Sequence, residues 1–134
     1  MSEPPRTILF VDDEVNILRV VARRLTREGY RVLTAESGEE GLRIAEAQRP
    51  DLILLDIMMP KMKGRDVCAR LKANPATQHI PVIFLSALGF ADHVKAGMDA
   101  GAEDYIIKPF QPGVLKERIA ICLARHHPPQ RSEP

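Results

Sequence analysis

Five polar side chains follow apolar runs of the sequence, at the points where buried strands would end. They are Asp12 and Asp13 after residues 7–11, Asp56 after 52–55, Ser86 after 82–85, and Lys108 at the end of 104–108. Central strands of a parallel sheet are almost purely apolar, so charged residues at these positions need a chemical explanation. Three carboxylates held close together repel one another unless a cation joins them. Mg²⁺ is the natural candidate, because it prefers oxygen ligands and is commonly held by one or two carboxylates.

This combination of residue types suits a phosphoryl group. A metal ion on the carboxylates would neutralise one phosphoryl oxygen, the Lys108 ammonium would balance a second, and the Ser86 hydroxyl would donate to a third. Asp56 ends the most apolar run, and it is therefore the carboxylate best placed to act as a nucleophile and carry an acyl phosphate. Asp12 and Asp13 have one other interpretation, because aspartate also caps a following helix well.

The elements that must position these residues alternate regularly along the chain. Short apolar runs predict five strands, at 7–11, 31–35, 52–55, 82–85 and 104–108. Helical periodicity predicts five helices between and after them. Four are expected at 15–28, 38–49, 91–100 and from 112 onward, and the third in chain order follows a loop with Pro60 and Gly64, runs through 67–71 and ends near residue 74. Parallel strands need crossover connections, so this alternation predicts an α/β protein with a doubly wound, five-stranded parallel sheet covered by helices on both faces. Ligands of such sheets bind at the carboxyl ends of the strands, which is where the five polar residues lie.

Composition limits the class of protein. The chain has 134 residues, 45% of them hydrophobic, and 19 Lys and Arg against 18 Asp and Glu. This length predicts one domain, placed at residues 6–126, with disordered tails at 1–5 and 127–134. The near-neutral charge argues against direct DNA binding. Two isolated cysteines and the lack of an apolar leader or membrane-spanning run predict a cytoplasmic protein.

Four sequence blocks together resemble the receiver domain of two-component response regulators. They are Phe10–Glu14, Leu54–Pro60, Leu85–Ala87 and Ala100–Phe110, and the resemblance covers about residues 6–125. It implies a flavodoxin-like receiver fold with strand order 2-1-3-4-5, and phosphoryl transfer from a sensor histidine kinase or a histidine phosphotransfer protein. By this resemblance Asp56 is the phosphoacceptor, Asp12 and Asp13 hold Mg²⁺ with Asp56, and Met58 adds its backbone carbonyl as a metal ligand.

The resemblance also implies how phosphorylation at Asp56 would change the surface of the domain. Lys108 would pair with the phosphoryl group, and Lys108–Pro109 would be a cis peptide. Ser86 and Tyr105 would form a switch pair, in which the serine hydroxyl moves toward the phosphoryl group and the tyrosine ring turns into the space it leaves. That movement would change the surface of the fourth helix, fifth strand and fifth helix. Ordinary strand packing is the other interpretation of Tyr105.

Three functional classes compete at this point. The leading one is a phosphorylation-driven switch that is not an enzyme beyond its own phosphorylation and slow dephosphorylation. It has no output domain in this chain, so it would act through a downstream target protein or as a phosphorelay element, and a phosphorylation-dependent dimer stays open. A phosphatase of the haloacid-dehalogenase kind would need a second aspartate where Met58 stands. A degenerate receiver, an interaction module that is never phosphorylated, is disfavoured because the five polar residues are intact.

Some positions depart from the family pattern. Lys61 and Lys63 make the loop after Pro60 more basic than is common in the family, and the segment 111–114 lacks an acidic residue often found there. Met58 and Leu88 stand two residues beyond Asp56 and Ser86, near the path that water must take to an acyl phosphate. Both side chains are bulky and apolar, which predicts slow self-dephosphorylation.

Overall fold

Five parallel strands form the centre of the molecule. A computed structural model describes residues 4–87, 89 and 91–126. The strands are β1 (Thr7–Val11), β2 (Arg31–Ala35), β3 (Leu52–Asp56), β4 (Val82–Ser86) and β5 (Asp104–Ile107). Their order in the sheet is β2-β1-β3-β4-β5, and every neighbouring pair is parallel. The predicted α/β fold and its strand order 2-1-3-4-5 are therefore confirmed.

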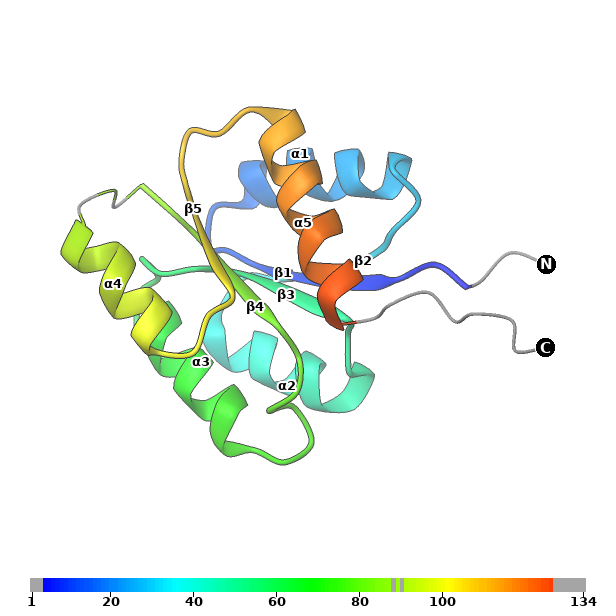
Figure 1. Cartoon of the computed structure of the whole chain (residues 1–134). Coiled ribbons are helices and arrows are strands. Elements are labelled where there is room, and N and C mark those ends of the chain that lie inside the picture. The colour runs from blue at the N-terminus through cyan, green and yellow to red at the C-terminus, as the bar shows by residue number, and fades with distance from the viewer. Residues whose placement is uncertain (1–3, 88, 90, 127–134) are drawn as a thin grey trace.

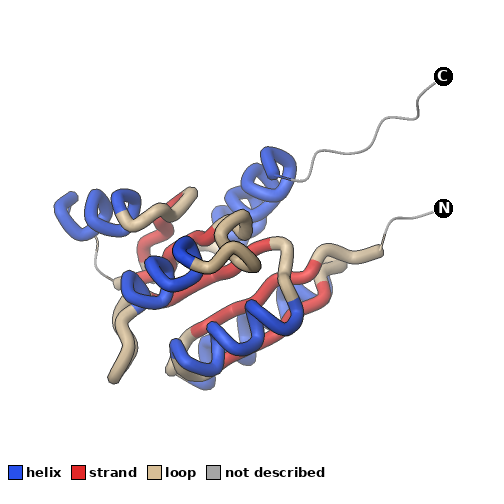
Figure 2. The backbone as a smooth tube through the Cα atoms, turned by 90° about the horizontal axis from the view of Figure 1, so that it is seen from below, coloured by secondary structure: helices blue, strands red, loops and turns tan. Residues whose placement is uncertain are grey.

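Helices cover both faces of the sheet, as Figures 1 and 2 show. They are α1 (Val15–Arg27), α2 (Gly38–Gln48), α3 (Gly64–Ala73), α4 (Ala91–Asp99) and α5 (Pro112–His126). Helices α1 and α5 lie on one face, and α2, α3 and α4 lie on the other. A strand sends successive side chains to opposite faces, so the central strands must be apolar at every position to serve both layers. All five residues of β3 and of β4 are buried.

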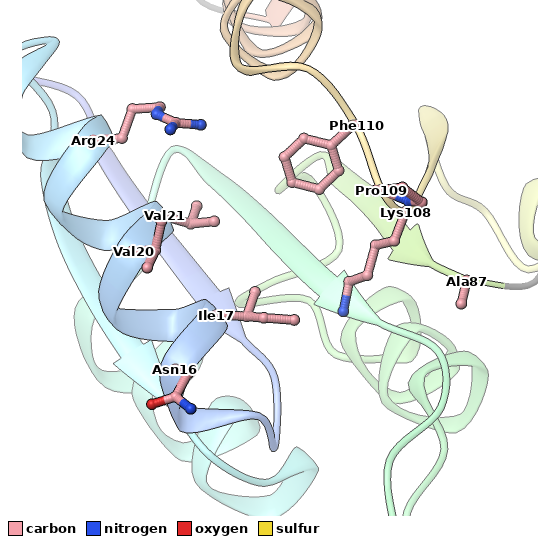
Figure 3. Close-up of a pocket in the computed structure, with 9 residues that line it drawn as sticks. All are labelled: Asn16, Ile17, Val20, Val21, Arg24, Ala87, Lys108, Pro109 and Phe110. Carbon is pink, nitrogen blue, oxygen red and sulfur yellow. The ribbon is translucent and has the colours of Figure 1, made fainter.

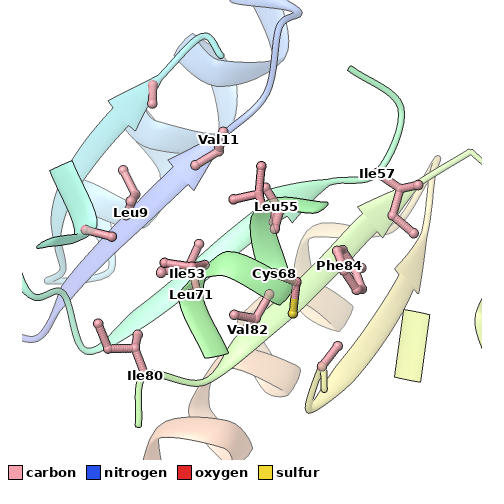
Figure 4. Close-up of a cluster of buried hydrophobic side chains, with 14 of the residues drawn as sticks. Leu9, Val11, Ile53, Leu55, Ile57, Cys68, Leu71, Ile80, Val82 and Phe84 are labelled. Carbon is pink, nitrogen blue, oxygen red and sulfur yellow. The ribbon is translucent and has the colours of Figure 1, made fainter. Parts of the chain in front are cut away.

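The core consists of two apolar clusters separated by the sheet. Leu9, Ile53 and Phe84 belong to the cluster under α2 and α3, which Figure 4 shows with Cys68 of α3 among them. Ile8 and Leu54, one residue away on the same strands, belong to the cluster under α1 and α5. A shift of one residue in the register of either strand would exchange the two clusters. The register that builds the core therefore also fixes which residue stands at each strand end.

Helix ends follow the local signals of the sequence. Helix α1 ends before Gly29, whose φ of 101° is the left-handed conformation that glycine adopts without strain. Ser37 caps α2, its Oγ accepting the Glu40 N–H at 3.2 Å. The Glu40 carboxylate accepts the Glu36 N–H at 2.8 Å, one residue earlier than the reciprocal bond of a capping box.

The ends of three strands differ slightly from the predicted boundaries, each at one of the polar residues singled out from the sequence. Strands β3 and β4 include Asp56 and Ser86, which were expected just beyond them. Strand β5 ends at Ile107, so Lys108 lies in the loop rather than in the strand. Its N–H still donates to the Ser86 carbonyl at 2.8 Å, which keeps its backbone aligned with the sheet. The predicted tails stay predictions, since residues 1–3 and 127–134 lie outside the described residues.

Gly64 allows α3 to begin directly against the end of β3. A Cβ at this position would overlap the Asp56 carbonyl oxygen and lie 2.7 Å from the Ile57 Cα, and backbone atoms cannot move aside as a flexible side chain can. Gly113, the second residue of α5, has no atom within 4 Å of the corresponding point.

We expect Gly64→Ala to destabilise the protein by about 2–3 kcal/mol, because the backbone carrying Asp56 must shift. Gly113→Ala should be neutral or stabilise it by up to about 1 kcal/mol, because alanine favours the helix. Urea denaturation of the two variants measures both effects. Equal stability of the two variants would show that the close approach at Gly64 has no energetic consequence.

Candidate functional site

Three aspartates meet at the carboxyl edge of the sheet, where two adjacent strands end. Asp12 and Asp13 follow β1, and Asp56 ends the neighbouring strand β3. One carboxylate oxygen from each residue lies within 4.8 Å of the other two. Asp12 is fully buried and Asp56 is 4% exposed, whereas Asp13 faces solvent. The convergence predicted from the sequence is therefore present in the structure.

Backbone groups orient the two buried carboxylates. The Glu14 N–H donates to Asp12 Oδ1 at 2.9 Å, and the Met58 N–H donates to Asp56 Oδ1 at 3.1 Å. Each bond spans two residues and is of the local kind that aspartate forms at a turn. Asp12 thus does help to order the start of α1, for which Glu14 is the N-cap residue. Each bond fixes the Oδ1 atom of its carboxylate, and the Oδ2 atom of each is left for the Lys108 ammonium group.

Lys108 directs its ammonium group into the carboxylate cluster. Its Nζ lies 2.8 Å from Asp12 Oδ2, 3.6 Å from Asp56 Oδ2 and 3.9 Å from Glu14 Oε1. The Lys108–Pro109 peptide is cis, as predicted. Glu14 was not singled out from the sequence, although its place directly after Asp12 and Asp13 brings it to the same edge. Its side chain is exposed, so it contributes charge at the mouth of the site rather than inside it.

Burial and crowding change the proton affinity of these groups. Burial is the largest cause that raises the pKa of Asp56 to about 6; the Lys108 ammonium opposes it, and the charge of Asp12 adds to it. For Lys108, burial alone would lower the pKa, but the hydrogen bond that its ammonium group donates to Asp12 and the charges of Asp56 and Asp12 outweigh the effect of burial and raise the pKa. The site therefore holds excess negative charge that one ammonium group does not balance.

The donor set fits Mg²⁺. Three carboxylates with oxygens in mutual reach supply the hard oxygen ligands that this ion prefers, and two of the three are buried where an unbalanced charge is costly. The exposed position of Asp13 leaves one side open for the waters that Mg²⁺ usually retains. Met58 donates its backbone N–H to Asp56 and has a side chain that is 56% exposed; its backbone carbonyl as a metal ligand stays a prediction.

Ser86 and Tyr105 lie on one face of the sheet. Ser86 ends β4, and Tyr105 pairs in register with Phe84, two residues before Ser86. Residues two apart in a strand point the same way, so Ser86, Phe84 and Tyr105 share a face. Ser86 is fully buried, and the Tyr105 ring is 7% exposed, tilted against Phe84 with ring centroids 6.2 Å apart. A Cβ on Gly97 would lie 3.0 Å from the Tyr105 ring, so α4 packs directly on it.

Comparison with known proteins decides the family. Residues 8–120 match the family described as "Response regulator receiver domain". The chain belongs to this family. A solved response regulator receiver domain protein from Clostridium thermocellum is 35% identical, with a TM-score of 0.83 over 90% of this chain and 95% of that one. A chain of the solved CheX–CheY–BeF₃–Mg²⁺ complex from Borrelia burgdorferi is 31% identical, with a TM-score of 0.82 over 87% of this chain and 88% of that one.

Curated relatives of this receiver domain are longer. The probable transcriptional regulator ycf27 of Cyanophora paradoxa is 44% identical over 128 residues, which are 95% of this chain and 52% of that protein. The chain thus spans about half the length of such relatives. In the described part of the chain, no helix has the length and apolar composition needed to cross a membrane.

We expect Asp56→Asn to stabilise the metal-free receiver domain by about 1–3 kcal/mol at pH 7. Asp56 has a folded pKa near 6 and an unfolded value of 3.8, so the folded state binds more protons between these values, and this group's contribution to stability falls as pH rises. The gain from the amide should therefore shrink as pH is lowered from 7 to 4.

Chemical denaturation in EDTA across this pH range measures the effect. Asp13→Asn is the matched control, because its exposed carboxylate should give a much smaller gain. A stability gain for Asp56→Asn that is the same at pH 4 and pH 7 would contradict the raised pKa.

Proposed function

We propose that this receiver domain accepts a phosphoryl group on Asp56 from a phosphohistidine of a sensor histidine kinase or a histidine phosphotransfer protein. The carboxylate oxygen of Asp56 attacks phosphorus, the N–P bond of the donor breaks, and imidazole leaves as the acyl phosphate forms. One observation supports this most strongly. Asp56 is a buried carboxylate with the Lys108 ammonium 3.6 Å away and two further carboxylates beside it.

The surrounding residues have separate roles in this proposal. Lys108 balances charge that develops on the phosphoryl oxygens and is already held by Asp12, so it needs little reorganisation. Mg²⁺ would be held by Asp12, Asp13, Asp56 and the Met58 carbonyl, and when bound it supplies charge neutralisation on the phosphoryl oxygens. The Ser86 hydroxyl donates a hydrogen bond to the phosphoryl group. This chemistry modifies the protein itself, so the domain is a switch and not a multiple-turnover enzyme.

In this proposal the conformational change begins at Ser86, continues through Tyr105 and reaches the surface of the domain. Tyr105 belongs to β5, and its ring packs against Phe84 of β4 and beside Gly97 of α4, so a turn of the ring would displace α4 relative to β5. The surface of α4, β5 and α5 carries four exposed apolar side chains, which are Met98, Ile107, Val114 and Ile121. Exposed apolar side chains on this surface would suit contact with a protein partner. A downstream target protein, or a second phosphorylated copy, would bind there.

The wider role of the protein is also a proposal. We infer that this chain acts in the cytoplasm, without contacting DNA itself, and through protein partners or as an element of a phosphorelay. The similarity to ycf27, a transcriptional regulator about twice as long, supports a link to gene regulation through sequence beyond the matched half. The intact set of site residues favours phosphorylation over a phosphorylation-independent interaction module.

We expect acetyl phosphate to add a single phosphoryl group to the wild-type chain only when Mg²⁺ is present. Asp56→Asn should show no adduct, because the nucleophilic oxygen is replaced by an amide. Asp51→Asn is the matched control: this aspartate caps the opposite edge of the sheet, accepting the Thr7 N–H at 2.7 Å, and its loss should leave the adduct intact. Intact-mass spectrometry measures all three, and an adduct on Asp56→Asn would refute the assignment.

We expect the phosphorylated state to decay slowly, and the double variant Met58→Asn with Leu88→Gln to decay about tenfold or more faster. The Met58 side chain is 56% exposed beside the phosphoacceptor and cannot orient an attacking water, whereas an amide can. Leu88 lies outside the described residues. Loss of the phosphoryl adduct with time, followed by mass spectrometry, gives the rates, and unchanged decay in the double variant would refute this explanation.

A further inference from the structure

The methionines of this chain differ in how far solvent reaches them. Met58 is 56% exposed, and Met98 of α4 is 40% exposed. Met59, the residue after Met58, is 6% exposed and belongs to the core cluster under α2 and α3. Met62 packs against the same cluster, and its Sδ lies 3.2 Å from the point where a Cβ on Gly38 would stand. Among the methionines that the structure describes, Met58 is therefore the most accessible to a reagent in solution.

The two cysteines are poor targets for an oxidant. Cys68 and Cys122 are both buried, and burial raises the pKa of each thiol, that of Cys122 to about 11. Peroxide reacts with the thiolate form of cysteine, which is scarce at neutral pH when the pKa is raised. The thioether of methionine needs no deprotonation, so access to the side chain governs its oxidation. Peroxide that reaches this domain would therefore oxidise Met58 before either cysteine.

Met58 stands beside the proposed phosphoacceptor. Its backbone N–H donates to Asp56 Oδ1 at 3.1 Å, which holds the Met58 backbone against that carboxylate. Its side chain belongs to neither of the two core clusters. An oxygen atom added to its sulfur therefore needs no space inside the protein, and the fold should stay intact. Oxidation of Met59 would instead place a polar group in the core, at a cost in stability.

The groups around the phosphoacceptor differ in whether they can accept a hydrogen bond from water. Lys108 and Ala87 line a hollow of about 560 Å³ between α1 and the loop after β5, and Figure 3 shows them opposite Ile17 of α1. An ammonium group only donates hydrogen bonds, and the alanine and isoleucine side chains form none. Asp12 and Asp13 would be occupied by Mg²⁺ in the proposed function. A hydrogen-bond acceptor on the Met58 side chain would therefore be a new means of placing water at this site.

We propose that Met58 is an oxidation site, and that conversion of its thioether to a sulfoxide by hydrogen peroxide shortens the lifetime of the phosphorylated state. The sulfur attacks one oxygen of the peroxide, the O–O bond breaks, and the second oxygen leaves as water with both hydrogens. The sulfur loses two electrons and the peroxide gains them. The effect on lifetime rests on the proposed function, because it requires an acyl phosphate on Asp56.

The sulfoxide changes what this side chain does to water. A thioether sulfur is a weak hydrogen-bond acceptor, whereas the sulfoxide is polar and its oxygen accepts readily. Beside Asp56, that oxygen holds a water molecule by one hydrogen and leaves the water oxygen free to attack phosphorus. The bond between phosphorus and the Asp56 oxygen then breaks, the water proton passes to the phosphate that leaves, and the carboxylate is restored. Oxidation thus returns the domain to its unphosphorylated state sooner.

Peptide mapping by mass spectrometry tests the site of oxidation. The unphosphorylated protein is treated with hydrogen peroxide in EDTA, and catalase then removes the oxidant. Met58 should gain one oxygen atom faster than Met98, because its side chain is more exposed. Met59 and Met62 should react about tenfold or more slowly than Met58 in the folded protein, and at a similar rate to it once urea has unfolded the chain.

The decay of the phosphoryl adduct tests the consequence of oxidation. Oxidised protein that is phosphorylated with acetyl phosphate and Mg²⁺ should lose its adduct about threefold or more faster than untreated protein. Met58→Leu should not respond to peroxide, whereas Met98→Leu, the matched control at the other exposed methionine, should respond as the wild type does. Met58→Gln carries an acceptor oxygen on its amide and should decay fast with or without peroxide. Methionine sulfoxide reductases, one for each sulfoxide epimer, should restore slow decay in the oxidised wild-type protein.

Three results would overturn the proposal. They are oxidation of Met59 or Met62 in the folded protein as fast as that of Met58, equal decay before and after oxidation, or acceleration by peroxide in Met58→Leu. The oxidation map needs no phosphorylation, so it is independent of the acetyl phosphate experiment. An adduct of unchanged lifetime on protein oxidised at Met58 would reject the redox role alone. Selective oxidation of Met58 in a protein that forms no adduct even before oxidation would reject the proposed phosphorylation, and the effect on lifetime with it.

Discussion

Electrostatic repulsion at one edge of the sheet is the constraint on which the rest of the structure depends. Asp12 and Asp56 are buried side by side with a third carboxylate in reach, and the Lys108 ammonium only partly offsets their charge. Such an arrangement survives only if the fold supplies enough stability elsewhere. The two apolar clusters on either side of the sheet supply it, because every residue of β3 and β4 is buried. The unbalanced negative charge is what would draw a cation into the site, and that cation together with the Lys108 ammonium would offset the charge of a phosphoryl group.

Parallel topology brings together charged residues from segments that are far apart in the sequence. Lys108 is 96 residues from Asp12, yet their side chains are hydrogen bonded at 2.8 Å. Crossover connections place the carboxyl end of every strand at the same edge of the sheet, so the order of the strands decides which of these end residues become neighbours. The order β2-β1-β3-β4-β5 places β1 against β3 and thereby Asp12 against Asp56. The register of the strands then fixes how far along the sheet each side chain lies. Gly64 lets α3 begin without displacing the Asp56 backbone.

Much of this arrangement could be predicted from the sequence, and the reasons are local. Runs such as 52–55 are apolar at every position because both faces of β3 are covered, and Gly29 and Ser37 mark helix ends by conformation and capping. The convergence of the aspartates followed from parallel strands alone. The hollow of about 560 Å³ between α1 and the loop after β5 could not be predicted in this way, because it is lined by Ile17 and Phe110, which are far apart in sequence. The exposure of Val20 is likewise a tertiary fact, as is the absence of an ion pair on the α1 arginines within the part of the chain that the structure describes.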